Sequence, residues 1–336
     1  MSTLKDVAKL AGVSVSTVSI VVNGTTKERK IPDSTVQKVQ AAIKKLGYRP
    51  NRSARQLRLL DKQEKEIAFF WALDKRTSSL SSLLLGLQAQ IVKLNLNWRI
   101  VIQTYQDNHL DLAIKNLENG YYDGAIIGAT SLEDLIKLEK NDNIQVPLIL
   151  INRTSKKYST VNVDPNSVAQ MTVTLLMAMN FNSMNIVSNS QYLASSQRIN
   201  ALKKIASQNH IKIKNTFKVD NTYDAGIKFA KNSLNDLPTS TPFIIESDAV
   251  AIGMVYFYNR NNIKIPRDLK LISMGTSDEK ITKYSTPSIT TIKTPNKDMS
   301  ANCINLMNIL LNQNDKPQHL IVEPKLNLRE SFPTNN

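Results

Sequence analysis

The chain has 336 residues, of which 41% are apolar and 21% charged, and a formal net charge of +15 at neutral pH. It is long enough to bury a sizeable core in one or two large units plus a small one. Its single cysteine, Cys303, excludes an intrachain disulfide and a cysteine metal cluster and favours a reducing cytoplasm. No apolar run approaches the ~20 residues of a membrane span, and no secretion signal is apparent at the N-terminus.

The first patterned stretch is Leu4 to Asn23, which reads LKDVAKLAGVSVSTVSIVVN. Its apolar residues keep helical spacing on both sides of a break at residues 11–13, where Gly12 provides the backbone freedom that a tight turn needs. Ser14 follows at the position of an N-cap, with Ser16 and Thr17 on the first turn of the second helix. The stretch predicts a helix-turn-helix that offers short polar side chains to phosphates or base edges.

Two further segments complete the N-terminal part. Residues 32–46 keep helical spacing and predict a third helix that closes a small core. After a break at residues 48–51, the segment 52–59 predicts a short, very basic helix. Helices of this length are marginal in water, so we expect this one to order only on meeting DNA or a second copy.

The positive charge is concentrated in this part of the chain. Residues 1–60 contain twelve lysines and arginines and only three acidic residues. A basic stretch beside a helix-turn-helix pattern is typical of nucleic-acid binding. Taken without the motif, the charge would more simply indicate a solvated basic surface.

Beyond a charged connector at residues 61–66, predicted strands and helices alternate. This alternation predicts parallel sheets with helices on both faces, in two doubly wound lobes. Ligands bind such sheets at the carboxyl ends of the strands, so we expect a site in a cleft between the lobes. The expected strands are 67–73, 98–104, 124–127, 147–151, 184–187, 217–219, 242–246 and 269–273, and the expected helices are 80–94, 110–118, 132–139, 167–179, 197–209, 225–234 and 249–259.

Residues 1–60 resemble the DNA-binding head of the LacI/GalR family of bacterial transcriptional repressors. The resemblance lies in the blocks LKDVAKLAGVSVSTVS, VVNG, LGYRPN and ARQL, which occur in the family's order and spacing. It continues through the rest of the chain, which is similar to the family's type I periplasmic-binding-protein-like effector domain. The matching blocks there are YYDGAIIG, VPLILINR, VNVD, SDAVAIG, IPRDLKLISMG, TPSITTIK and LRES.

The resemblance implies an N-terminal all-α helix-turn-helix head with a hinge helix, followed by an α/β two-lobed domain. The implied divisions are a head at 1–50, a hinge helix and linker at 51–65, and an effector-binding and dimerisation domain at 66–336. Within that domain, lobe 1 would hold about 66–162 and 291–321, and lobe 2 about 163–290 and 322–336.

The resemblance also implies which residues contact DNA. Val15, Ser16 and Ile20 would face the major groove, and Leu57 would wedge into the minor groove with Ala54 packed beside it. The full set implied is Leu4, Ser14, Val15, Ser16, Thr17, Ser19, Ile20, Asn23, Thr35, Tyr48, Asn51, Ala54, Arg55 and Leu57.

Two features of the head depart from the family. Relatives usually have an arginine at the position of Ile20, where its fork reads guanine, whereas isoleucine makes only apolar contacts such as with a thymine methyl. The basic loop TTKERK at residues 25–30 is longer than usual and could add phosphate contacts. The alternative is that Ile20 packs inward and the loop is a tolerated insertion.

The same resemblance implies an effector site for a sugar. Arg198 would grip a sugar hydroxyl, and Asp248 retains the family's acidic position. Trp71 could stack on a pyranose face or be a core aromatic. The set implied is Trp71, Asn152, Arg198, Asn221, Ser247, Asp248 and Gly275.

Four positions of this site depart from relatives, which often have Asp at 152, Asn at 247, Asp at 275 and Gln at 294. This chain has Asn152, Ser247, Gly275 and Thr294. The relatives' side chains at these positions commonly hydrogen-bond a sugar. Their replacement here implies either a changed ligand or a lost inducer site.

A Rossmann-type enzyme is the main rival for the larger domain. No two glycines are separated by a single residue, and no Walker-type G-K-[ST] occurs, so both phosphate-binding motifs are excluded. The three histidines lie far apart in sequence, and we expect no catalytic residue, no metal and no cofactor.

The sequence therefore predicts a DNA-binding transcriptional regulator in the bacterial cytoplasm, at the nucleoid. It would be a homodimer that represses sugar-utilisation genes, binds double-stranded operator DNA, and responds to a small effector, expected to be a sugar. No leucine heptads follow Ser331, so no tetramerising tail is expected. The alternatives are a cytoplasmic sugar-binding protein or enzyme with a basic surface, a regulator that has lost its inducer site, and an activator or partner-assisted repressor.

Overall fold

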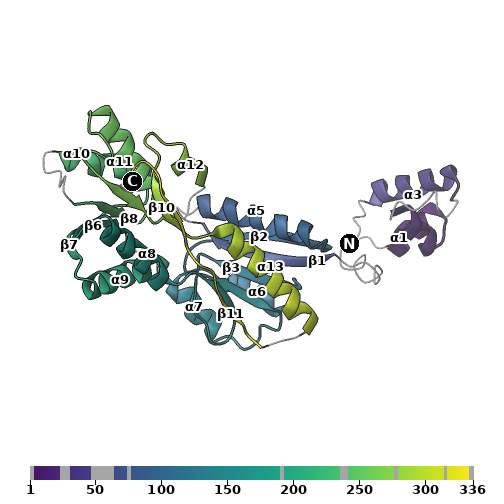
Figure 1. The fold of residues 1–336 in the computed structure, drawn as a ribbon. Coiled ribbons are helices and arrows are strands. Elements are labelled where there is room, and N and C mark those ends of the chain that lie inside the picture. The colour runs from purple at the N-terminus through teal and green to yellow at the C-terminus, as the bar shows by residue number, and fades with distance from the viewer. Residues whose placement is uncertain are drawn as a thin grey trace. The chain divides into compact units, whose positions relative to one another are not determined.

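The computed structural model describes residues 4–22, 31–46, 64–73, 77–189, 193–234, 241–275, 279–313 and 316–332. The chain divides into two compact units, Met1–Glu64 and Lys65–Asn336 (Figure 1). The helix predicted at 52–59 lies outside the described residues. Where the structure describes the chain, no helix combines the length and apolar character needed to cross a bilayer.

The described residues of the first unit form three helices, as predicted. Val7 and Ala8 of the first helix, Val18 of the second, and Val39 and Ala42 of the third form its buried core. The apolar periodicity of the sequence thus closes a three-helix core of small and β-branched side chains. The helices are α1 (Leu4–Ala11), α2 (Val15–Val22) and α3 (Asp33–Leu46).

The second unit is built on two six-stranded sheets. The first sheet is parallel, with strand order β11-β5-β4-β3-β1-β2. One face carries α5 (Thr77–Lys93) and α13 (Asn296–Gln313), and the other carries α6 (Asp111–Glu118) and α7 (Leu132–Glu139). The strands are β1 (Lys65–Ala72), β2 (Trp98–Tyr105), β3 (Gly124–Gly128), β4 (Leu148–Ile151), β5 (Ser159–Asn162) and β11 (His319–Ile321).

The second sheet has order β12-β10-β9-β8-β6-β7 and is parallel except for its edge strand β12. Helices α8 (Pro165–Ala178) and α9 (Leu193–Gln208) pack on one face, α10 (Tyr223–Asn232) and α11 (Asp248–Arg260) pack on the other, and the short α12 (Glu279–Lys283) precedes β10. The strands are β6 (Ser183–Ser188), β7 (Lys212–Lys218), β8 (Phe243–Ile245), β9 (Leu271–Ser273), β10 (Thr290–Lys293) and β12 (Lys325–Asn327). Two lobes with helices on both sheet faces are confirmed.

The chain passes between the two lobes three times. It crosses after β5, after β10 and after β11, because each of these strands is followed by an element of the other lobe (Figure 1). The second crossing follows Lys293 and so falls a few residues later than the predicted boundary at 290/291. Residues 291–293 pair with β12, and Thr291 also pairs with β9, which places them in the second lobe.

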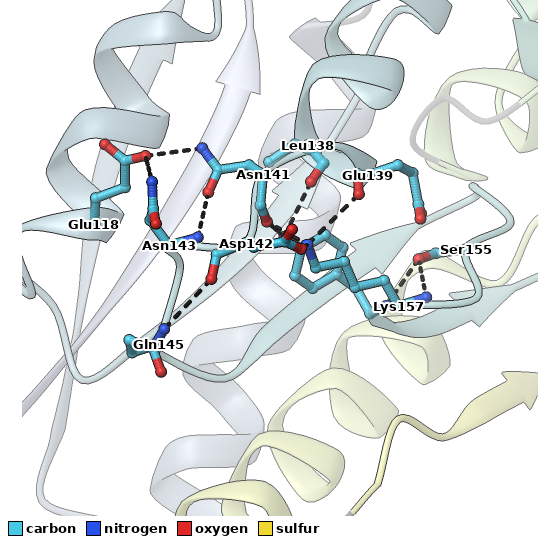
Figure 2. Close-up of polar contacts among 10 residues, drawn as sticks. Glu118, Leu138, Glu139, Asn141, Asp142, Asn143, Gln145, Ser155 and Lys157 are labelled. Atoms are coloured by element: carbon cyan, nitrogen blue, oxygen red, sulfur yellow. Dashed lines mark hydrogen bonds and ion pairs between the residues drawn. The ribbon is translucent and has the colours of Figure 1, made fainter.

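A polar cluster closes the C-terminal end of α7 and orders the loop that leads to β5 (Figure 2). Lys157 Nζ donates hydrogen bonds to the carbonyl oxygens of Glu139 and Asn141 and lies 2.6 Å from Asp142 Oδ1. A cation is stabilised at this end of a helix by its unsatisfied carbonyls. The hydrogen bond between Lys157 and Asp142 raises the pKa of the lysine and lowers that of the carboxyl. The cluster fixes the approach to the first crossing between the lobes.

Helix α13 belongs to the core of the first lobe although it follows a strand of the second. Its buried residues include Met299, Cys303, Met307 and Leu310. Burial raises the pKa of the Cys303 thiol, which therefore stays protonated. Among the described residues, no group of three or more His, Cys, Asp or Glu side chains could hold a metal ion.

Candidate functional site

The second helix of the first unit begins at a well-defined N-cap. Ser14 Oγ accepts a hydrogen bond from the backbone N–H of Thr17 at 3.1 Å, and it lies 2.7 Å from Ser16 Oγ and 2.8 Å from Thr17 Oγ1. Just before it, Gly12 has a positive φ of 66°, and the N–H of Val13 donates to the carbonyl of Ala8 at 3.1 Å. These contacts fix the turn and set the direction in which α2 leaves it.

The N-terminal end of α2 is the part that faces solvent. Val18 is fully buried in the three-helix core, whereas Ser14 and Ser16 are exposed and Val15 is 38% exposed. The structure thus brings Ser14, Val15 and Ser16 together at a helix N-terminus, where hydroxyl groups and the positive end of the dipole suit a phosphate or a base edge.

The other predicted DNA contacts that the structure describes are less exposed. Thr17, Ser19 and Ile20 of α2 are partly buried. Within the described residues, Ile20 is not among the side chains of the three-helix core cluster. Leu4 and Thr35 are partly buried near the starts of α1 and α3. The remaining predicted contacts, Asn23, Tyr48, Asn51, Ala54, Arg55 and Leu57, lie outside the described residues.

In the second unit, a cavity of about 150 Å³ lies where the two lobes meet. It is lined by residues 152–154 beyond β4, by Gln197 and Arg198 of α9, and by residues from all three crossings. Asn152 and Arg198 are the two predicted effector residues that the structure brings to this cavity. The lining also includes Arg153, Asn162, Asp164 and Gln197, which were not predicted.

Asn152 connects the first lobe to the first crossing. It has a positive φ of 53°, a conformation that asparagine tolerates, and its Oδ1 accepts a hydrogen bond from the N–H of Val163 at 3.3 Å. The neighbouring Arg153 is buried and donates from Nε to the carbonyl of Thr130 at 2.6 Å. Asn152 is thus held at the edge of the cavity by the chain that leaves this lobe.

Arg198 is anchored from the second lobe. Its Nη2 donates to Glu246 Oε1 at 2.9 Å, with 16% and 10% of the two side chains exposed. Among the described residues, its buried Nε has no hydrogen-bond partner, and the same holds for Oδ1 of Asn162. One unused donor and one unused acceptor therefore belong to residues that line the cavity, as a site for a hydroxylated ligand requires.

Trp71 and the pair Asn221–Ser247 do not line this cavity. Trp71 is 4% exposed and packs in the core of the first lobe, with its ring centroid 5.8 Å from that of Phe69, which fits the core alternative rather than stacking on a sugar. Ser247 Oγ donates a hydrogen bond to Asn221 Oδ1 and caps α11 by accepting from the N–H of Val250. The structure therefore brings Ser247 and Asn221 together as hydrogen-bond partners.

Asp248 lies in a buried polar cluster that the sequence did not reveal. Ser273 Oγ donates to Asp248 Oδ1 at 2.5 Å, and Lys293 Nζ lies 4.0 Å from Oδ2 with both side chains almost fully buried. A Cβ atom on Gly275 would lie only 2.2 Å from Asp248 Cγ. The absence of a side chain at Gly275 is what admits the Asp248 carboxylate, and Lys293 balances its charge.

Known proteins are similar to this chain over most of its length. The model of "Bacterial regulatory proteins, lacI family" matches residues 3–51, and that of "Periplasmic binding protein-like domain" matches residues 184–332. The HTH-type transcriptional regulator MalR of Clostridium butyricum is 28% identical, with 98% of each chain covered.

Solved structures are similar over most of the chain. A LacI family transcription regulator from Clostridium acetobutylicum is 30% identical with a TM-score of 0.73, over 79% of this chain and 100% of that one. A lac repressor dimer bound to operator and the anti-inducer ONPF is 21% identical with a TM-score of 0.73, over 99% of both chains.

The close approach at Gly275 gives a test of the buried cluster. We expect Gly275→Ala to lower the free energy of unfolding by about 1–3 kcal/mol, because the added methyl group displaces the Asp248 carboxylate. In an Asp248→Ala background the same substitution should cost much less, since the colliding group is gone. Urea unfolding of the four proteins of this cycle measures the difference, and equal costs in both backgrounds would contradict the packing described.

Proposed function

Because the chain belongs to the LacI family of transcription regulators, we propose that it is a sequence-specific DNA-binding repressor of sugar-utilisation genes, controlled by a small effector bound between its two lobes. It is a regulator and not an enzyme. The proposed place of action is the nucleoid, in the bacterial cytoplasm.

One observation carries the DNA-binding part of this proposal: the capped, exposed N-terminus of α2 on a compact three-helix core. An α-helix fits the major groove, and Val15, Ser16 and Ile20 are the proposed groove-facing residues. The twelve cations of residues 1–60 supply the attraction to phosphates. Leu57, with Ala54 beside it, is the proposed minor-groove wedge.

A homodimer matches two heads to the half-sites of a near-palindromic operator. Exposed apolar side chains support an interface on the second unit. Leu85 and Val92 are 68% and 69% exposed and, seven residues apart, lie on one face of α5, while Tyr256 of α11 is 51% exposed in the other lobe. Burying such side chains against a second copy removes their apolar surface from water.

The effector part of the proposal rests on the cavity at the crossings. Its lining comes from both lobes, so a ligand there has different contacts when the lobes move. Such differential affinity is what allows an effector to change the population of the DNA-binding state. Asn152 and Arg198 are the proposed contacts, whereas Asn221, Ser247, Asp248 and Gly275 are not among the described residues that line this cavity.

The central test is a salt titration of DNA binding. An operator is first selected from a random duplex library with the full-length protein, and its affinity is then measured by fluorescence anisotropy. The logarithm of the affinity should fall linearly with the logarithm of salt concentration, by about 0.9 per neutralised phosphate, with several phosphates neutralised. A flat response, or the failure to select any sequence, would favour a sugar-binding protein with a basic surface instead.

Ile20 provides a test of base readout. The variant Ile20→Arg should gain a preference for guanine at one position of each half-site, worth about 1–3 kcal/mol, because the guanidinium fork can bond both guanine acceptors. Repeating the selection with this variant measures the change. Ile20→Leu keeps an apolar side chain and should retain the original preference, and an unchanged selection with Ile20→Arg would remove Ile20 from the interface.

The dimer interface can be tested by adding charge. We expect Leu85→Glu/Val92→Glu to weaken dimerisation by at least about tenfold, because the interface would bury two unpaired carboxylates. Analytical ultracentrifugation measures this, with circular dichroism to check the fold. The control Leu132→Glu/Ile136→Glu changes two exposed apolar residues of α7 and should leave the dimer intact. Equal effects of both pairs would place the interface elsewhere.

A further inference from the structure

A second and larger cavity, of about 390 Å³, lies where residues of the two lobes meet near the second crossing. The first lobe contributes Ser82 of α5 and the start of α13, and the second lobe contributes α12, β10 and β12. Five lysines line it, and we call it the lysine pocket. They are Lys280 and Lys283 of α12, Lys293 of β10, Lys297 of α13 and Lys325 of β12.

The lysine pocket keeps an excess of positive charge after its ion pairs are counted. Three carboxylates pair at its wall, namely Asp248 with Lys293 at 4.0 Å, Asp298 with Lys325 at 2.5 Å, and Glu279 with Arg329 at 2.8 Å. Beyond these three pairs, Lys283 and Lys297 keep charges that no carboxylate of the described residues pairs.

Two of the lysines are open to a ligand. In the part of the chain that the structure describes, Lys283 and Lys297 have no carboxylate partner, and both are exposed. Lys283 Nζ lies 5.4 Å from the centre of the Tyr284 ring, a cation–π contact that leaves its charge uncompensated. Convergent lysines repel each other, and a bound anion would relieve that repulsion.

The rest of the lining is suited to a small hydroxylated molecule. Ser82, Tyr284, Asn296 and Asn327 add hydroxyl and amide groups to the cations. Helix α13, which begins at Asn296, directs the positive end of its dipole to the same wall. A recess of this size holds a small molecule, which favours such a ligand over a nucleic acid or a protein surface.

We propose that the lysine pocket binds a small hydroxylated effector that carries one or more phosphate groups. The inference rests on the proposed function, in which a ligand between the lobes controls operator affinity, and it assigns that ligand an anionic class. Lys297 belongs to the first lobe and Lys283 to the second. A phosphate held by both links the lobes across their junction and stabilises the arrangement in which they approach.

The test is direct binding of the full-length protein to glucose 6-phosphate, ribose 5-phosphate and inorganic pyrophosphate, with glucose and ribose as neutral probes. Isothermal titration calorimetry and thermal shift are the readouts. We expect at least one phosphorylated probe to bind and to raise the melting temperature in a concentration-dependent way. Its unphosphorylated parent should bind at least about tenfold more weakly, because it lacks the charge-assisted bonds.

A matched pair of variants locates the binding. Lys283→Gln/Lys297→Gln should lower the affinity for the phosphorylated probe by at least about tenfold. Lys203→Gln/Lys204→Gln removes the same charge from exposed positions on α9 and should leave the affinity unchanged. Both pairs change exposed side chains, so the melting temperature without ligand checks that each variant is folded.

Several results would overturn the inference. The first is that none of the phosphorylated probes binds. The second is that a sugar and its phosphate bind equally well, and the third is that the two double variants lose probe affinity equally. A loss of operator affinity in Lys283→Gln/Lys297→Gln without a loss of probe affinity would instead make the pocket a nucleic-acid surface. Operator binding is measured separately, so a protein that binds operator and no phosphorylated probe loses this inference and keeps the proposed function.

Discussion

The three passages of the chain between the lobes are the constraint on which the larger unit depends. A chain that crosses once would allow each lobe to fold alone, whereas here α13 of the first lobe follows a strand of the second. Movement of one lobe must therefore act on all three crossings together. Both cavities include residues of these crossings, with Thr294 common to the two. A ligand in either place acts on the segments that any change in the angle between the lobes has to bend.

The buried pair of Asp248 and Lys293 shows how a substitution in a binding site is accommodated. An ionised group in the interior is costly unless it is paired and hydrogen-bonded. Ser273 and Lys293 meet that requirement for Asp248, and Gly275 provides the space. Gly275 stands at a position that resembles an acidic one in relatives. Its missing side chain leaves space for the carboxylate of Asp248, and Lys293 balances that charge. The Asp248 carboxylate is therefore already paired with Lys293 and hydrogen-bonded to Ser273.

Much of the fold could be predicted from the sequence because its strong patterns are local. The three helices of the head and the first two strands, with their helices, follow from apolar periodicity and from runs such as IAFFWAL. The elements that were missed are short or atypical. Strands β5, β10, β11 and β12 have three or four residues each. Helix α13 carries four asparagines among its first thirteen residues, which weakens its propensity, and it is held by burial of Met299 and Cys303 instead.

The candidate site was less predictable, because its chemistry depends on partners far apart in the sequence. No local pattern connects Asp248 to Lys293, or Lys283 to Lys297, until the sheets order the chain. Family resemblance indicated where a sugar would bind, and the departures at Ser247, Gly275 and Thr294 indicated only that something differs. The structure adds the reason. Asp248 is buried against Lys293, and near the second crossing Lys283 and Lys297 have no carboxylate partner among the described residues. Ammonium groups without a carboxylate partner favour an anionic ligand, because a bound anion offsets their mutual repulsion.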